Sequence, residues 1–127
     1  MSDKNECGCG CSTALKLIFP CSGAADVGAI SDQAARKLTK DGAGKMYCLA
    51  GIGGRVSGIM ATTESAGTIL AIDGCPQDCA KNTLENAGFK KYSHVRVTDL
   101  GMEKGKTAVT PANIAKVAAA GAEKLGC

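Results

Sequence analysis

Tryptophan is absent from this chain of 127 residues, and aromatic residues of all kinds make up only 3% of it. Grooves that bind single-stranded nucleic acid stack bases on aromatic rings, so this composition argues against such a groove. The 15 lysines and arginines are spread among 12 acidic residues and give a net charge of +3. Without a basic stripe to follow a phosphate backbone, we expect no nucleic-acid partner.

Long apolar runs are missing as well. No run reaches the roughly eighteen residues that a membrane-spanning helix needs, and the N-terminus lacks the basic start and apolar stretch of a signal peptide. We therefore expect a cytoplasmic protein that does not associate with membranes. In that reducing compartment, eight cysteines are expected to act as ligands or catalysts and not to form disulfides.

Strand-like and helix-like segments alternate along the chain. The apolar patterns predict strands at residues 15–21, 45–49, 68–72 and 92–98. A helical pattern follows each strand, with Pro76 and Pro111 as first helical residues of the third and fourth helices. This order predicts an α/β fold with three layers, in which a mostly parallel four-stranded sheet is flanked by helices in a Rossmann-like arrangement. Right-handed crossovers favour the strand order 2-1-3-4.

The composition divides the chain into two parts. Residues 1–14 are polar and rich in cysteine and glycine, and we expect a flexible tail. Residues 15–127 carry the alternating pattern and are predicted to form a single α/β domain. With so few aromatic residues, its core must be built from alanine, valine, isoleucine, leucine and methionine. A chain of this length can bury enough of its surface to fold without a metal or a disulfide.

Four cysteines are predicted to meet at one edge of the sheet. Cys21 ends the first strand, Cys48 lies near the end of the second, Cys75 directly follows the third, and Cys79 comes four residues later. The carboxyl ends of parallel strands lie at one edge, where such folds bind ligands. Four thiolates can bind Zn²⁺ tetrahedrally, and a site of this type is usually structural. The sequence therefore predicts a zinc site; an iron–sulfur cluster uses the same ligands and is less favoured.

These residues resemble a known family. The central Asp73-Gly74-Cys75 followed by Cys79, the Cys21-Ser22-Gly23 turn with 26–28 behind it, and Cys48 in the second strand are similar to the landmarks of prokaryotic DGC-domain proteins. The resemblance covers about residues 15–125. It implies a zinc-binding protein that uses Cys21, Cys48, Cys75 and Cys79. It does not supply a physiological role, so metal handling and metal sensing both stay open.

The alternative is a cysteine-thiolate enzyme in redox, sulfur or oxyanion chemistry. Glycine-rich residues 49–54 separate Cys48 from Arg55, and such a loop can hold an oxyanion over a thiolate. Cysteine phosphatases have five residues in that interval, whereas this chain has six. We therefore leave it uncertain whether the protein is an enzyme, and we assign no catalytic residue. Arg55 is otherwise expected to be an ordinary surface residue.

Further predictions concern residues outside the four core cysteines. His94, the sole histidine, is expected at the start of the fourth strand, at the end opposite the cysteines. Asp73 is expected to accept backbone N–H bonds and to orient the site. Three cysteines of the tail lie at alternate positions, namely Cys7, Cys9 and Cys11. They could bind a second metal ion or donate to the first, but we favour an oxidation-prone tail without a site. Cys127 is expected to be a frayed surface thiol. The sequence predicts neither protein partners nor oligomeric state.

Overall fold

The computed structural model describes residues 14–126. The predictions made for Cys7, Cys9 and Cys11, and for Cys127, fall outside these residues and stay predictions.

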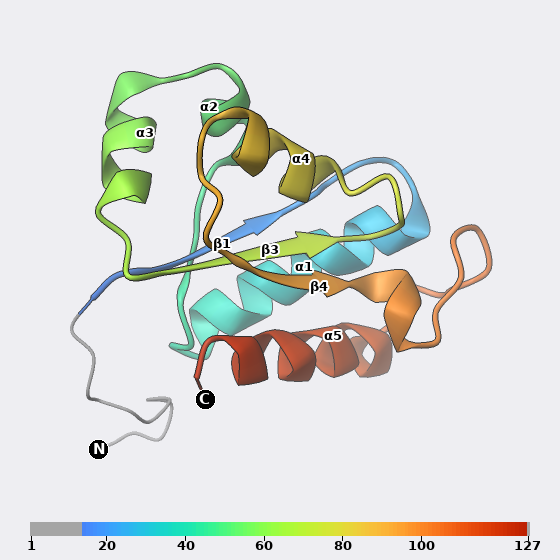
Figure 1. Ribbon diagram of the computed structural model, residues 1–127. Coiled ribbons are helices and arrows are strands. Elements are labelled where there is room, and N and C mark those ends of the chain that lie inside the picture. The colour runs from blue at the N-terminus through green and yellow to red at the C-terminus, as the bar shows by residue number, and fades with distance from the viewer. Residues whose placement is uncertain (1–13, 127) are drawn as a thin grey trace.

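A four-stranded sheet forms the middle of the domain (Figure 1). Its strands are all parallel and lie in the order β2-β1-β3-β4, which confirms the predicted α/β fold and strand order. β3 pairs with β1 on one side and with β4 on the other. The bounds are β1 (Lys16–Pro20), β2 (Lys45–Met46), β3 (Thr68–Asp73) and β4 (Ser93–Arg96).

Helices cover both faces of this sheet (Figure 1). One face is covered by α1 (Asp26–Lys40) and α5 (Pro111–Lys124), which pack against each other. The other face carries α2 (Leu49–Gly53), α3 (Ser57–Glu64) and α4 (Cys79–Asn86). Pro111 is the first residue of α5, as predicted, and the Thr110 side chain caps that helix by accepting from the Asn113 N–H. Within residues 14–126, no helix has both the length and the apolar character needed to cross a membrane.

Alternate residues of the central strands enter two separate cores. In β1, Leu17 and Phe19 face α2 and α4, whereas Ile18 faces α1 and α5. β3 continues both cores, and all its residues after Thr68 are buried. Strands that are buried on both faces are nearly all apolar, which is why the sequence marks β3 so clearly. Asp73 is the one charged residue of β3, and its side chain is 1% exposed.

Four predictions of secondary structure were wrong. The second strand was predicted at residues 45–49, but β2 ends at Met46, so Cys48 lies after the strand and not in it. The glycine-rich stretch after Cys48 is not an open turn, because Leu49–Gly53 forms the short helix α2. The fourth strand ends at Arg96 and passes into the 3-10 helix η1 (Val97–Leu100). Pro76 does not open a helix. It lies in a turn closed by the Asp78 N–H, which donates to the Cys75 carbonyl at 3.1 Å, and α4 begins only at Cys79.

Candidate metal centre

Two turns at the carboxyl edge of the sheet pack backbone against backbone. One is the β1–α1 turn after Cys21, and the other is the β3–α4 turn that contains Gly74 and Cys75. A Cβ atom on Gly74 would lie 2.9 Å from the Val27 carbonyl carbon and oxygen. A Cβ atom on Gly28 would lie 2.9 Å from the Gly23 nitrogen. Glycine is therefore required at Gly74 for the close approach of the Cys75 turn to the start of α1, and at Gly28 for the tight β1–α1 turn that follows Cys21.

Cys21 extends β1 by one residue and is half-buried. Its N–H donates to the Ile72 carbonyl at 2.8 Å, and its sulfur accepts from the Gly74 N–H at 3.1 Å. Burial raises the pKa of the Cys21 thiol above its ordinary value of 9.0. Hydrogen bonds from Ser31 and Gly74 lower this pKa, whereas the charges of Asp73 and Cys79 raise it further.

Cys75 packs on the other side of the edge. It contacts the core between the sheet and the α1–α5 layer, whereas Cys21 contacts the core beneath α2 and α4. The sulfur of Cys75 lies 3.8 Å from the Lys104 ammonium. Cys21 and Cys75 are thus joined through Gly74, but they belong to opposite layers of the domain.

Cys48 and Cys79 are both exposed. Cys48 is the N-cap residue of α2. It lines an open cavity of about 420 Å³ together with Ser22 and Thr83. Ser22 directly follows Cys21, and Thr83 comes one helical turn after Cys79. Cys79 is the first residue of α4. The helix predicted to start at Pro76 would place Cys79 one helical turn after Cys75, but Asp78 has a left-handed backbone (φ 54°) between them and α4 starts only at Cys79.

The structure therefore brings the four cysteines to one edge without closing them around a point. Among residues 14–126, no three cysteine sulfurs lie within 4.8 Å of one another. In a tetrahedral zinc site with bonds of about 2.3 Å, neighbouring sulfurs are about 3.8 Å apart. Metal binding by all four sulfurs would require their side chains or the exposed turns to move.

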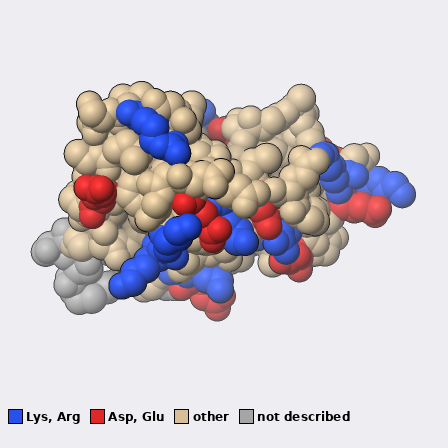
Figure 2. Space-filling model, turned by 45° about the horizontal axis from the view of Figure 1, so that its top comes forward, with Lys and Arg blue, Asp and Glu red and all other residues tan. Residues whose placement is uncertain are grey.

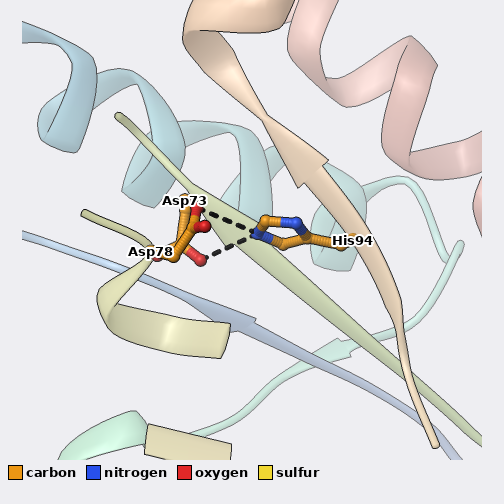
Figure 3. Close-up of side chains that lie close together, drawn as sticks. All are labelled: Asp73, Asp78 and His94. Atoms are coloured by element: carbon orange, nitrogen blue, oxygen red, sulfur yellow. Dashed lines mark hydrogen bonds and ion pairs between the residues drawn. The ribbon is translucent and has the colours of Figure 1, made fainter. Parts of the chain in front are cut away.

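Asp73, Asp78 and His94 form a second polar cluster beside the cysteines (Figure 3). His94 Nε2 lies 2.9 Å from an Asp73 oxygen and 3.7 Å from an Asp78 oxygen. The prediction that His94 lies at the opposite end from the cysteines was wrong. β4 is short, and its second residue pairs with Ala71, two residues before the end of β3. From this position the imidazole reaches forward to the carboxyl edge.

The Asp73 side chain holds the start of α4 in place. Its two oxygens accept the N–H groups of Ala80 and Lys81 at 2.6 and 3.0 Å. The first N–H groups of a helix have no partners within the helix, so a buried carboxylate satisfies them well. The predicted role of Asp73 as an acceptor of N–H bonds is confirmed, although the donors belong to α4 and not to the turn that follows Asp73.

Asp78 is fixed by an arginine from β4. Arg96 donates to both Asp78 oxygens, at 2.9 and 2.7 Å, and also pairs with Asp99. The hydrogen bonds from Arg96 hold the pKa of the Asp78 carboxyl below its ordinary value. This bidentate pair supports the left-handed turn at Asp78, directly before Cys79. Because Arg96 already neutralises Asp78, we do not assign the Asp73–Asp78–His94 cluster as a cation site.

Arg55 does not face the Cys48 thiol as an oxyanion-binding residue would. It has a left-handed backbone (φ 57°) between α2 and α3. Its guanidinium donates to the carbonyls of Ile52, Gly53 and Asn86. These carbonyls end α2 and α4, so Arg55 joins the two helices. This use of the guanidinium weakens the case for an oxyanion loop between Cys48 and Arg55.

The Asp26 carboxylate fastens the loop of residues 101–110 to the β1–α1 turn. It accepts the N–H groups of Gly105, Thr107 and Val27 at 2.9, 3.0 and 2.7 Å. These bonds, first those from Gly105 and Thr107, hold the pKa of Asp26 below its ordinary value of 3.8. A group with a lowered folded-state pKa stabilises the fold above its unfolded pKa. The tether is therefore complete at neutral pH.

We expect acid to release this tether only below pH 3.8. As the pH falls through the lowered pKa, Asp26 gains a proton and the stabilisation is lost. The amide resonances of Gly105 and Thr107 should shift together, with one midpoint below 3.8. In the Asp26→Asn variant this shared transition should vanish. A midpoint at or above 3.8 would show that the two amides do not bind the carboxylate.

Comparison with known proteins identifies the family of this chain. A family model described as "DGC domain" matches residues 17–120, which include all four core cysteines. The chain belongs to the DGC domain family. One relative in this comparison is the anaerobic and virulence modulator AnvM of Pseudomonas aeruginosa, 32% identical over 90 residues, which are 71% of this chain and 69% of AnvM. No solved structure gives a significant match.

Proposed function

We propose that this DGC domain binds one zinc ion through the thiolates of Cys21, Cys48, Cys75 and Cys79 and that it handles or senses this metal. The observation that carries the proposal is the contact between the two turns, in which the Gly74 N–H donates to the Cys21 sulfur at 3.1 Å. This contact holds Cys21 next to the turn that carries Cys75, and Cys79 begins α4 directly after that turn. Cys48 faces the cavity that separates it from Ser22 and Thr83.

The donor set suits zinc. Thiolates are the ligands of tetrahedral zinc sites, and N–H groups that point at sulfur offset part of the charge of −2 that four thiolates and one Zn²⁺ carry. Gly74 already supplies such a donor. The Thr98 hydroxyl is buried without a partner among the described residues, and the Thr98 N–H donates to the Gly74 carbonyl at 3.3 Å. A further donor is thus available near the turn that carries Cys75.

The arrangement favours an exchangeable site over a structural one. Two clusters of buried apolar side chains pack on the two faces of the sheet, so we infer that the core does not depend on a metal. Cys21 and Cys75 are held by packed turns, whereas Cys48 and Cys79 are exposed. A metal that binds two fixed and two exposed thiolates can be released without unfolding the domain, as a carrier or a sensor requires.

Zinc content tests the proposal directly. We expect the protein, purified under reducing conditions, to contain about one zinc per chain by elemental analysis, as a single tetrahedral site requires. Replacing any of the four core cysteines with serine should reduce the affinity for zinc by about 100-fold or more, because the loss of a ligand costs more than the 10–100-fold loss for an outer-shell partner. Near-zero zinc in the reduced wild-type protein would refute the proposal.

The other cysteines supply the control. A variant with serine at Cys7, Cys9, Cys11 and Cys127 keeps only the four core thiols. It should retain one zinc ion with unchanged affinity. If this variant loses the metal instead, the site includes cysteines outside residues 14–126. If iron and visible absorbance accompany the protein, the same ligands hold an iron–sulfur cluster.

The name of the relative bears on the physiological role. AnvM is named as an anaerobic and virulence modulator. Of the two roles proposed for the zinc site, sensing is the one closer to that name. The alternative, a thiolate enzyme, would need one selectively reactive cysteine. Uniform, slow alkylation of the four core thiols in metal-free protein would count against this alternative.

A further inference from the structure

The loop of residues 101–110 folds over the cysteine edge. It joins η1 to α5 and turns twice through glycines with a left-handed backbone, Gly101 (φ 86°) and Gly105 (φ 87°). Within the loop, the Glu103 N–H donates to the Thr107 hydroxyl, which in turn donates to the Glu103 carbonyl. The segment between Glu103 and Thr107 is therefore a closed turn with a defined shape.

Two contacts hold the turn of residues 103–107 near the cysteines. The Asp26 carboxylate accepts the N–H groups of Gly105 and Thr107, which joins the loop to the turn that follows Cys21. Lys104 directly precedes the tethered Gly105 and extends its ammonium to 3.8 Å from the Cys75 sulfur. Lys104 comes from a segment 29 residues away from Cys75 in sequence, so this contact depends on the tether. On the face shown in Figure 2, cationic and anionic side chains are interspersed.

We propose that Lys104 is a charge-compensating residue of the zinc site and that the loop held by Asp26 controls the release of the metal. The inference rests on the proposed function. Four thiolates around Zn²⁺ leave a charge of −2, and a neighbouring ammonium stabilises that charge by Coulomb attraction. The ammonium lies 3.8 Å from the Cys75 sulfur, so its loss removes a positive charge next to one of the proposed ligands. Loss of the ammonium or of the tether then speeds metal release.

Transfer of zinc to an excess of a chromophoric chelator measures this effect on the full-length, zinc-loaded protein. Lys104 is exposed, and water weakens the interaction of exposed charges. We therefore expect Lys104→Gln to transfer zinc only about fivefold faster than wild type. Lys104→Arg keeps the charge and should transfer at the wild-type rate. Lys106→Gln is the matched control, since Lys106 lies in the same loop but pairs only with Glu103, at 3.8 Å.

Salt separates a charge effect from a structural one. Salt at about 1 M shortens the screening length to roughly 3 Å, so it should accelerate transfer from the wild type and leave Lys104→Gln nearly unchanged. A merely structural role would give both proteins the same salt dependence. Equal transfer rates for wild type and Lys104→Gln, or equal acceleration in Lys104→Gln and Lys106→Gln, would overturn the role of Lys104.

The tether has its own test. Asp26→Asn should also accelerate transfer, and the double variant Asp26→Asn/Lys104→Gln should be no faster than Lys104→Gln if Asp26 acts by placing Lys104. In the metal-free protein, Asp26→Asn should raise hydrogen exchange at Gly105 and Thr107. Fully additive rates would overturn the link between Asp26 and Lys104. Failure of the wild-type protein to bind zinc refutes the proposed function, whereas zinc binding with unaltered transfer rates refutes this inference alone.

Discussion

Replacement of Asp73 with alanine is expected to lower the free energy of unfolding by about 3–5 kcal/mol, because it removes the buried partner of several polar groups at once. The carboxylate accepts the N–H groups of Ala80 and Lys81 and bonds to His94. Its side chain is 1% exposed, so water cannot replace the lost bonds at that position. The first turn of α4 should fray, and Cys79 lies in that turn.

Urea denaturation of the metal-free protein measures the loss, and hydrogen exchange locates it. Exchange should rise first at Ala80 and Lys81. Asp73→Asn, which keeps one acceptor oxygen, should fall between alanine and wild type. Asp41→Asn is the control, because Asp41 is half-exposed and pairs only with Lys37, at 3.2 Å; it should change stability by less than about 0.5 kcal/mol. Unchanged exchange at Ala80 in Asp73→Ala would refute the role given to this carboxylate.

The sequence predicts the sheet well because the strands carry their own signals. β3 is apolar on both faces, as a central parallel strand must be, and β1 has the same pattern up to Pro20. Crossover handedness then limits the possible strand orders, and the predicted order is the one observed. The glycine-rich segment after Cys48 misled the prediction, because its intrinsic preference for turns is overridden when Ile52 packs into the core and α2 forms.

The polar cluster beside the cysteines could not be predicted from the sequence, because it depends on the relative position of two strands. His94 and Asp73 meet because β4 begins opposite Leu70 and is only four residues long. No local pattern fixes such an offset. The start of α4 was misplaced for a similar reason: proline suits the first helical position, but it also suits the second position of a β-turn. The pairing of Arg96 with Asp78 stabilises the turn.

The sequence predicts that four cysteines meet at one edge of the sheet, whereas the structure joins the turns of Cys21 and Cys75 there and forms no cluster of three cysteine sulfurs within residues 14–126. Parallel strands do deliver Cys21 and Cys75 to one edge, and Gly74 joins their turns. The side on which each sulfur lies depends on the conformation of the turn after each strand. Cys75 turns toward the α1–α5 layer after Gly74, and therefore contacts Lys104. A residue such as Lys104, 29 positions away in a loop without a motif, has no signal in the sequence.

Gly74→Ala is expected to lower the free energy of unfolding by about 1–3 kcal/mol, the usual cost of an added methyl group in a packed site. The new Cβ would lie 2.9 Å from the Val27 carbonyl and 3.0 Å from the Gly28 nitrogen. These are backbone atoms at the start of α1, so they cannot move aside as a flexible side chain could. Since Gly74 does not have a positive φ, the cost comes from the clash and not from backbone strain.

Separation of the two turns by this methyl group should also weaken the zinc site, because it lengthens the bond between the Gly74 N–H and the Cys21 sulfur. Gly58→Ala is the matched control: a Cβ on Gly58 meets nothing within 4 Å, and its position inside α3 should make alanine stabilising by about 0.5–1 kcal/mol. Urea denaturation compares the two variants, and competition with a chelator gives their zinc affinities. If Gly74→Ala binds zinc as tightly as Gly58→Ala, close packing of the Cys21 and Cys75 turns is not what assembles the site.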